Sequence, residues 1–481
     1  MTGKVVIGRQ AAKDILDKAL DNNKASLVTV YGRRRVGKTY LIKQHLEKYI
    51  SFQYQGIHNI TTELQLDKFT KALSSQLNNQ KPLPTQADWF DAFSLLGSLL
   101  NKKRSKRLVI FLDEFPWMQT PKSNFLAAFE NFWNGWATDK ATVTVIICGS
   151  AASWMIQKVV RNKGGLHNRI THKIELQPFT LYETELFLKS RNISLNHYQV
   201  IQLYMAIGGI PQYLELAQPG MSAAQIIDTA CFSKNGFLYN EFSELYHALF
   251  YKAERHIKII RVLAAKPEGL NRNQLIKAVK LQTGGTATTL FEELSAAGFI
   301  TPYIPFGKKI KDTVYKLTDE YSLFYLKFME PNRSTAKGTW QKLSNTPAYT
   351  SWSGLAFETL CIKHTEAIKK ALGIAAIHTE SSSWRAPGAQ IDLLIDRRDQ
   401  CVNLCEMKFY SSDFTIDKKY AAALRLKETV FKQQTKTRKQ IFFTLVTTFG
   451  LIKNEHSIGL VDSVITADKL FADIKEESKD L

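Results

Sequence analysis

The sequence has few cysteines and no long apolar run. Its five cysteines are odd in number, scattered and placed in apolar stretches, so we expect reduced core residues and no disulfide framework. No apolar run approaches the roughly 18 residues that cross a bilayer, and residues 1–5 contain no apolar core of signal-peptide length. These absences favour a cytoplasmic protein without membrane association.

Acidic residues are scarce relative to basic ones. The 481 residues include 44 Asp and Glu against 64 Lys and Arg, a net charge of +20 that no single tail carries. Nucleic acid or another polyanion is therefore an expected partner, and a basic surface kept for solubility is the alternative. The apolar fraction of 44% is that of a globular protein, and the length predicts about three or four domains.

The clearest motif lies in residues 31–39, which directly follow the apolar run 27–30. Two glycines allow backbone N–H groups to turn around a phosphate, and a helix is expected where the loop ends. The G-x-x-x-x-G-K-T pattern predicts that Lys38 reaches the β and γ phosphates of ATP and that the Thr39 hydroxyl binds Mg²⁺. A chance glycine-lysine turn is the alternative for the bare pattern. The expected nucleotide contacts are Gly32, Arg33, Arg34, Arg35, Val36, Gly37, Lys38, Thr39 and Tyr40.

A second motif, in residues 108–114, weakens the chance alternative. An apolar strand, residues 108–112, runs directly into Asp113 and Glu114. At the carboxyl edge of a parallel sheet, such an aspartate can hold Mg²⁺ and the glutamate after it can activate water. Together the two motifs predict an ATPase.

Two further polar residues lie close to predicted strands. The apolar strand 143–149 ends at Ser150, which could hydrogen-bond the attacking water or the γ phosphate. Capping of the next helix is a competing role for Ser150, and the two roles are compatible. Arg169 precedes the strand 174–176 and would stabilise the transferring phosphoryl group if it lay close to it. A lone arginine is more often a surface residue.

The order of the expected elements predicts an α/β protein of several domains. Residues 1–175 alternate strands and helices, which indicates a doubly wound parallel sheet around the P-loop. Residues 176–249 are helical, with a turn forced by the glycines and proline of residues 208–214. Residues 250–330 have the layout of a winged helix, and residues 331–352 are polar and broken by proline and glycine, which is typical of a linker.

The third helix of the winged-helix layout is poorly suited to reading DNA. Such a helix should present basic or amide side chains to the groove, whereas this one offers Glu292 and Glu293, which repel phosphate. Only the wing tip, residues 307–309, is basic. A protein-interaction or structural role is therefore the alternative to sequence-specific DNA binding.

A second set of chemical groups lies in residues 353–481, which we expect to form an α/β domain. Alternation along the strand 402–408 places Glu406 and Lys408 on one side, and Asp392 can face them from the neighbouring strand. Two acids can hold a second divalent metal, Mg²⁺ or Mn²⁺, and the lysine can orient or activate water for phosphodiester attack. Chance placement of common polar residues on exposed strands is the alternative.

The motifs of the first half, in their order, resemble the archaeal-type ATPase family, which is related to AAA+ and STAND ATPases. The resemblance begins at Gly8-Arg9 and departs from the family at Gln10-Ala11. It implies that residues 176–249 form a helical lid, in which Gly209 and Pro211 contact the nucleotide near the adenine. The motifs that carry it are residues 31–39, 112–114, 147–150, 169–179 and 208–214.

The resemblance extends to the C-terminal region. In this family the winged helix is commonly followed by a domain of the restriction-endonuclease-like PD-(D/E)XK fold, which residues 353–481 resemble. That fold implies metal ligation by Glu358, Asp392 and Glu406, and catalysis by Asp392, Glu406 and Lys408. Such domains can lose metal binding, so nuclease activity is a separate prediction from the fold.

These features lead to two main functional hypotheses. In the first, ATP hydrolysis gates nucleic-acid binding, with DNA favoured, or metal-dependent cleavage, and the basic run 416–439 follows the nucleic-acid backbone. In the second, the chain is a nucleotide-switched scaffold whose inactive nuclease-like domain binds a protein, and the basic run is a solvated helix face. A transcription regulator is a third hypothesis, which Glu292 and Glu293 disfavour. A homo-oligomer, with an arginine from a neighbouring subunit at the ATP site, is compatible with all three.

Overall fold

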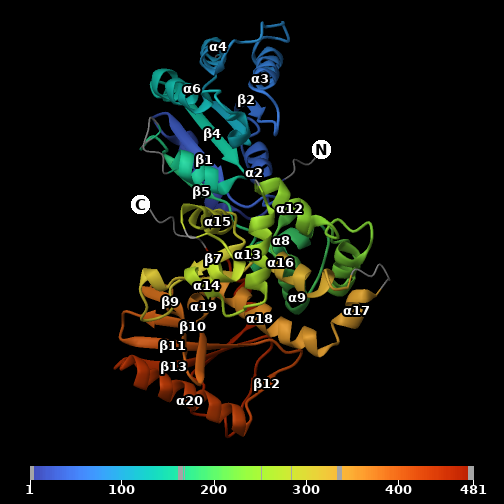
Figure 1. Cartoon of the computed structure of the whole chain (residues 1–481), viewed down its shortest axis with the longest axis vertical. Coiled ribbons are helices and arrows are strands. Elements are labelled where there is room, and N and C mark those ends of the chain that lie inside the picture. The colour runs from blue at the N-terminus through green and yellow to red at the C-terminus, as the bar shows by residue number, and fades with distance from the viewer. Residues whose placement is uncertain are drawn as a thin grey trace. The chain divides into compact units, whose positions relative to one another are not determined.

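The computed structural model divides the chain into two compact units (Figure 1). The N-terminal unit extends to Pro178, and the C-terminal unit comprises Phe179–Ile474. The structure describes residues 5–103, 105–160, 166, 168–250, 252–282, 284–332 and 338–474. Among these residues, none of the helices combines the length and the apolar character that a bilayer crossing requires. All five cysteines are free thiols, as predicted.

The N-terminal unit is built around a five-stranded parallel sheet in the order β2-β3-β4-β1-β5. The strands β1, β3 and β4 are buried along their whole length, which explains why they read as continuous apolar runs. This sheet confirms the predicted parallel α/β architecture. The strands are β1 (Ser26–Tyr31), β2 (Ile50–Gln55), β3 (Leu108–Asp113), β4 (Val143–Gly149) and β5 (His172–Glu175).

Helices connect these strands and supply the core. The helix α1 packs on β1 and β5, while α3 packs on β2 and α4. Edge-to-face contacts of Phe69, Trp89 and Phe125 join α3, α4 and α6 in an aromatic core. The helices are α1 (Gln10–Asp21), α2 (Lys38–His45), α3 (Thr62–Leu77), α4 (Trp89–Asn101), α5 (Phe115–Met118), α6 (Phe125–Phe132) and α7 (Ala152–Trp154), with π-helical turns at Trp133–Ala137 and Met155–Val160.

The C-terminal unit begins with helices, as predicted for residues 176–249. Thr180 and Ser222 start two of them with capping boxes, in which side chain and backbone bond reciprocally. These helices are α8 (Leu181–Ser190), α9 (His197–Ile207), α10 (Pro211–Leu214), α11 (Ala223–Ile227) and α12 (Glu241–Leu249), with a π-helical segment at Asp228–Phe232.

The next part of this unit is a small helical module with a three-stranded antiparallel sheet in the order β6-β8-β7. The structure changes the expectation that Glu292 and Glu293 both face solvent and repel phosphate. The Glu293 carboxylate lies 2.7 Å from Nε2 of buried His256 in α13, so it is directed into the module, and Glu292 alone of this pair is exposed. The elements are α13 (Glu254–Ala264), β6 (Leu270–Asn271), α14 (Arg272–Val279), α15 (Gly285–Ala296), β7 (Ile300–Tyr303) and β8 (Val314–Leu317).

The expected linker, residues 331–352, differs from the structure. Residues 333–337 lie outside the described residues, and helices cover most of residues 338–352. Trp340 and Trp352 are 3% and 7% exposed, and both pack edge-to-face on Phe324. Proline did not break the helix because Pro347 occupies its first turn, where no N–H partner is needed. The helices here are α16 (Glu320–Phe324), α17 (Thr339–Leu343), α18 (Pro347–Lys363) and α19 (Thr365–Ala371), with a π-helical segment at Tyr325–Met329.

The chain ends in a mixed five-stranded sheet in the order β15-β13-β11-β10-β9 (Figure 1). The first three strands in the sequence form an antiparallel meander, and β13 and β15 add parallel to β11. The helix α18 packs on β11, and α20 packs on β9 and β10. The elements are β9 (Thr379–Ala386), β10 (Ala389–Arg397), β11 (Cys401–Lys408), α20 (Lys418–Thr435), β13 (Gln440–Thr447) and β15 (Ser463–Thr466), with a small pair formed by β12 (Phe414–Thr415) and β14 (Leu451–Ile452).

Candidate functional site

The loop between β1 and α2 depends on both of its glycines. A Cβ at Gly32 would lie 2.3 Å from the carbonyl oxygen of Leu176, and the φ of 141° is strained for any other residue. Gly37 has φ 91° and precedes the first residue of α2, so it makes the left-handed turn into the helix. The loop conformation is therefore fixed by the two positions that the sequence motif specifies.

Lys38 lies folded over this loop. Its ammonium donates hydrogen bonds to the carbonyl oxygens of Gly32 at 2.9 Å and Arg33 at 2.8 Å. Burial lowers the pKa of Lys38, and the nearby side chains of Glu114 and Asp113 act in the opposite direction. A phosphate at the loop would offer this buried ammonium a full negative charge in place of two carbonyl dipoles.

Arg9 is a structural part of the site. The sequence indicated no role for it beyond the resemblance of Gly8-Arg9 to the start of the family. One guanidinium nitrogen donates to the carbonyl oxygen of Val36 in the loop at 3.0 Å, and the other donates to Gln177 at 2.5 Å. The left-handed backbone of Gly8 and Arg9 places the side chain there. A glycine followed by arginine just before the first helix was the only signal in the sequence.

Asp113 and Thr39 meet at the carboxyl edge of the sheet. The Thr39 hydroxyl donates to Asp113 Oδ2 at 2.8 Å, and Asp113 is only 2% exposed. Asp113 ends β3, and Thr39 lies at the start of α2, after the loop that follows β1. The strand β4 lies between β1 and β3, and all three strands are parallel and end at the same edge. A hydroxyl and a carboxylate side by side near a phosphate loop suit the oxygen-ligand preference of Mg²⁺, so the predicted pair fits this ion.

Glu114 and Ser150 form a second pair at this edge. Glu114 Oε2 accepts hydrogen bonds from the Ser150 hydroxyl at 2.9 Å and from its backbone N–H at 3.1 Å. Glu114 has φ 45° and ψ 46°, a left-handed conformation that is uncommon for glutamate and concentrates at functional sites. The structure therefore gives Ser150 a contact with Glu114 that the sequence did not predict, and its predicted contact with water or the γ phosphate stays a prediction.

The remaining predicted contacts of the ATP site differ in their exposure to solvent. Among the loop arginines Arg33 is buried, whereas Arg34 and Arg35 are half-buried, and Tyr40 is 44% exposed. Arg169 is exposed in a turn of the N-terminal unit, so its contact with a phosphoryl group stays a prediction.

Gly209 and Pro211 belong to the C-terminal unit, and their contact with nucleotide also stays a prediction. The structure gives Gly209 a packing role. A Cβ there would lie 2.0 Å from the Phe179 carbonyl oxygen, and the Phe179 N–H donates to the Gly209 carbonyl at 2.7 Å. Pro211 is the first residue of α10, where its fixed φ favours helix initiation.

The second predicted site lies on the C-terminal sheet. Leu393 of β10 pairs with Cys405 of β11, and Asp392 and Glu406 are the residues next to this pair. Asp392 lines a cavity together with Glu358 of α18, whereas Glu406 contacts α20. A register shift between Ile391 and Leu394 places a bulge at Asp392. Bulges re-aim side chains and are frequent next to functional sites.

The metal set predicted for this site is not assembled. Both carboxylate oxygens of Glu406, which is 5% exposed, are engaged by α20: the Tyr420 hydroxyl donates to Oε2 at 3.0 Å, and the Lys427 ammonium pairs with Oε1. Lys408 lies over the Tyr420 ring, 4.8 Å from its centroid. Within the described ranges, no three His, Cys, Asp or Glu side chains gather closely enough to hold a metal ion. A second metal therefore does not fit Glu358, Asp392 and Glu406 as they stand.

Glu358 retains an unusual environment despite this. Burial in α18, and then the charge of Asp392, raise the pKa of Glu358 to about 7. The side chains of Lys408 and Lys316 oppose this shift. The carboxyl is therefore partly neutral at neutral pH and can donate as well as accept a hydrogen bond.

Comparison with known proteins finds a family model that is similar to the part of the chain carrying these motifs. The family model described as "ATPase domain predominantly from Archaea" matches residues 7–217, which extend past Pro178 through α10. An uncharacterized protein of Methanocaldococcus jannaschii is 23% identical over 414 residues, which are 84% of this chain and 87% of that protein. An uncharacterized ATP-binding protein of the same organism is 49% identical over 41 residues, which are 8% of this chain and 70% of that protein.

Solved structures show a more distant similarity. The Walker-type ATPase of Pyrococcus abyssi has a TM-score of 0.48 and 17% identity, and the match covers 67% of this chain and 96% of that one. The ORC2 protein of Aeropyrum pernix, in its ADPNP-ADP complexes, has a TM-score of 0.43 and 14% identity, with 72% and 97% covered. Residues 7–217 of this chain match that family model, and the loop, Asp113 and Glu114 all lie within the matched residues.

Proposed function

We propose that this domain binds and hydrolyses ATP. The observation that carries the proposal is the meeting of two polar pairs, Thr39 with Asp113 and Glu114 with Ser150, at the edge of the sheet where the phosphate loop lies. In a parallel sheet, ligands bind outside the carboxyl ends of the strands, at the point where the strand order reverses. That point lies beside β1, whose neighbours are β4 and β5.

Each residue then has a role in the reaction. The loop N–H groups and the Lys38 ammonium bind the β and γ phosphates, and Lys38 exchanges its two carbonyl partners for phosphate oxygens. Glu114 accepts the proton of the attacking water, and the Ser150 hydroxyl holds the glutamate in place. Mg²⁺, held by Thr39 and Asp113, would neutralise phosphate charge.

Lys38→Ala tests this site. Loss of the ammonium should lower the rate of ATP hydrolysis by about 100-fold or more, because the charge that develops on the phosphates loses its nearest cation. Phosphate release measures the rate, and a fluorescent ATP analogue measures binding. Lys43→Ala, on the same helix but outside the loop, should retain both. Normal hydrolysis by a correctly folded Lys38→Ala chain would contradict the assignment.

We further propose that the C-terminal unit binds nucleic acid, with DNA favoured, and that ATP turnover gates this binding. Support comes from α20, where basic side chains are exposed while Lys427 is committed to Glu406. A row of exposed cations on one helix is an electrostatic match for a phosphate backbone. The exposed cations of α20 are Lys418, Lys419, Arg425 and Lys432, of which Lys432 pairs with Glu428, and the exposed Lys436 directly follows the helix.

The engagement of Glu406 favours a binding role for the nuclease-like domain over metal-dependent cleavage. It also keeps the alternative of a nucleotide-switched scaffold with an inactive domain that binds a protein partner. The winged-helix assignment of residues 250–330 and the nuclease-like assignment of residues 353–481 are part of this proposal. Their support is the order of helices and strands in each segment.

Reversing charge on α20 separates the two alternatives. The double variant Lys418→Glu/Arg425→Glu should weaken the binding of duplex DNA by at least about tenfold at 0.1 M salt, and should flatten the dependence of affinity on salt. Fluorescence anisotropy over a salt series measures both. Lys68→Glu/Lys342→Glu, at exposed positions elsewhere, is the matched control. DNA affinity that is equal in the two variants, or absent in the native chain, would favour the scaffold.

A further inference from the structure

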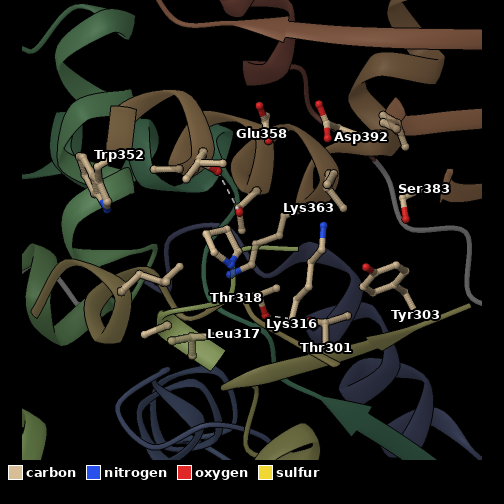
Figure 2. Close-up of a pocket in the computed structure, with 18 of the residues that line it drawn as sticks. Thr301, Tyr303, Lys316, Leu317, Thr318, Trp352, Glu358, Lys363, Ser383 and Asp392 are labelled. Carbon is tan, nitrogen blue, oxygen red and sulfur yellow. Dashed lines mark hydrogen bonds between the residues drawn. The ribbon is translucent and has the colours of Figure 1, made fainter. Parts of the chain in front are cut away.

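The C-terminal unit contains a large cavity between two of its parts. One wall comes from α13, β7 and β8, and the opposite wall from α18, α19, β9 and β10. The cavity has a volume of about 850 Å³, within the range of sites that enclose small molecules. Figure 2 shows Lys316 rising from one side of it, with Glu358 and Asp392 on the other.

Lys316 is the cation most available to a ligand here. Its ammonium lies 5.0 Å from the centroid of the Tyr303 ring, and within the described part of the chain no carboxylate forms an ion pair with it. Burial lowers the pKa of Lys316, which shows that its charge is poorly solvated. Asp392, Glu358 and Glu268 partly offset the burial, whereas Arg385 adds to it.

Three of the other cations at this cavity, Lys363, Lys369 and Arg261, have carboxylate partners, and Lys327 is exposed to solvent. Lys363 forms an ion pair with Glu320 at 2.6 Å, and Arg261 pairs through two nitrogens with Glu330. These pairs neutralise the end of the cavity that is formed by α13, α16 and α18. Among the described residues of the cavity, Lys316 is therefore a half-buried cation without an ion pair, and the charges of Asp392 and Glu358 act on it.

One further polar group at the same cavity has no protein partner. The half-buried Glu358 carboxyl on α18 makes no hydrogen bond with any described residue, and it lines the cavity together with Asp392. A polar group of this kind at a cavity is available to a ligand or to ordered water.

The rest of the lining is apolar. Leu323 and Leu326 on one side, and Trp352 and Leu355 on the other, form a surface against which a flat ring can pack. A ligand that satisfies the whole cavity therefore combines an anionic group, hydrogen-bond donors and an apolar or aromatic body. A nucleoside monophosphate has all three.

We propose that this cavity binds a small phosphate ester of the size of a mononucleotide, separately from the ATP site. Lys316 takes the phosphate, Glu358 and Asp392 accept hydrogen bonds from sugar hydroxyls or base amino groups, and the apolar wall packs against the base. The site gives the C-terminal unit a ligand of its own. It goes beyond ATP hydrolysis and nucleic-acid binding, and it does not depend on either.

The test uses the full-length Lys38→Ala chain, which removes nucleotide binding at the phosphate loop. Titration calorimetry with AMP, GMP, CMP and UMP should show binding of at least one of them in the micromolar range. Lys316→Met, added to this chain, should weaken that binding at least tenfold. Lys316→Arg should retain most of it, and Lys342→Met, at an exposed position outside the cavity, should leave it unchanged.

Circular dichroism and thermal unfolding establish that each variant is folded. Glu358→Gln is the second cavity variant, and it is expected to weaken binding or to change the preferred base. No heat of binding up to about 1 mM nucleotide would overturn the proposal. Equal affinity in the folded Lys316→Met chain would also overturn it, as would binding only of a 5′-phosphorylated oligonucleotide. ATP hydrolysis by the native chain is measured separately, so failure here is distinguishable from failure of the ATPase assignment.

Discussion

Replacing Glu114 by glutamine is expected to lower the rate of ATP hydrolysis by at least about 100-fold while ATP still binds, because a general base contributes rate and not affinity. The amide has the same shape and can keep a hydrogen bond to Ser150, but it cannot accept a proton from water. Phosphate release at saturating ATP measures the rate, and equilibrium dialysis with labelled ATP measures the affinity.

Ser150→Ala is the matched control for this experiment. It leaves the base intact and removes one of the two hydrogen bonds that hold it, since the backbone N–H of residue 150 still donates. The rate should therefore fall by a smaller factor, about tenfold or less. A chain in which Glu114→Gln hydrolyses ATP at the native rate would remove Glu114 from the role of base.

Lys427→Ala should destabilise the C-terminal sheet by about 3 kcal/mol, because it leaves the Glu406 carboxylate buried without its cation. The effect should appear as faster amide exchange in β11 and α20, measured by hydrogen-deuterium exchange with mass spectrometry. Local exchange is the appropriate readout because two units need not unfold together.

The double variant Lys427→Met/Glu406→Gln provides the control. It removes both charges at once, so its stability should lie closer to that of the native chain. Mn²⁺ added to the native chain without nucleotide should leave the exchange of β11 unchanged, since both Glu406 oxygens are already engaged. Strong protection of β11 by Mn²⁺ would show that the lysine gives way to a metal, and would restore the nuclease hypothesis.

The meeting of the phosphate loop with Asp113 could be predicted because local sequence determines it. A buried parallel strand needs a continuous apolar run, and its end must lie at the common carboxyl edge. Asp113 could thus be placed beside Thr39 although 74 positions separate them in the chain. The function of Arg9 could not be predicted, because it depends on how the chain returns to Gln177 after the last strand of the sheet.

The C-terminal site shows where such reasoning stops. Strand alternation predicted Glu406 and Lys408 on one side of β11, and in the structure both lie beside Tyr420 of α20. The bulge at Asp392 could not be predicted from the alternation. The partners of Glu406 come from α20, and only tertiary packing decides which face of a basic helix turns inward. The position of Lys316 could not be predicted for the same reason. The sequence indicated a winged helix, for which DNA binding was one hypothesis, whereas packing against α18 makes this module one wall of a cavity. Likewise, the polar residues and prolines of residues 331–352 predicted a linker. The burial of Trp340 and Trp352 could not be predicted, because it depends on packing against residues that lie elsewhere in the chain.

The two hydrogen bonds of Arg9 connect the phosphate loop to the last residues of the N-terminal unit. One guanidinium binds the backbone of the phosphate loop at Val36 and the backbone of Gln177, the residue immediately before Pro178. A planar guanidinium transmits displacement because its nitrogens are rigidly joined. Any tightening of the loop around a triphosphate would pull directly on the peptide that leads onward to Phe179, so the covalent tether itself can carry the motion out of the nucleotide site.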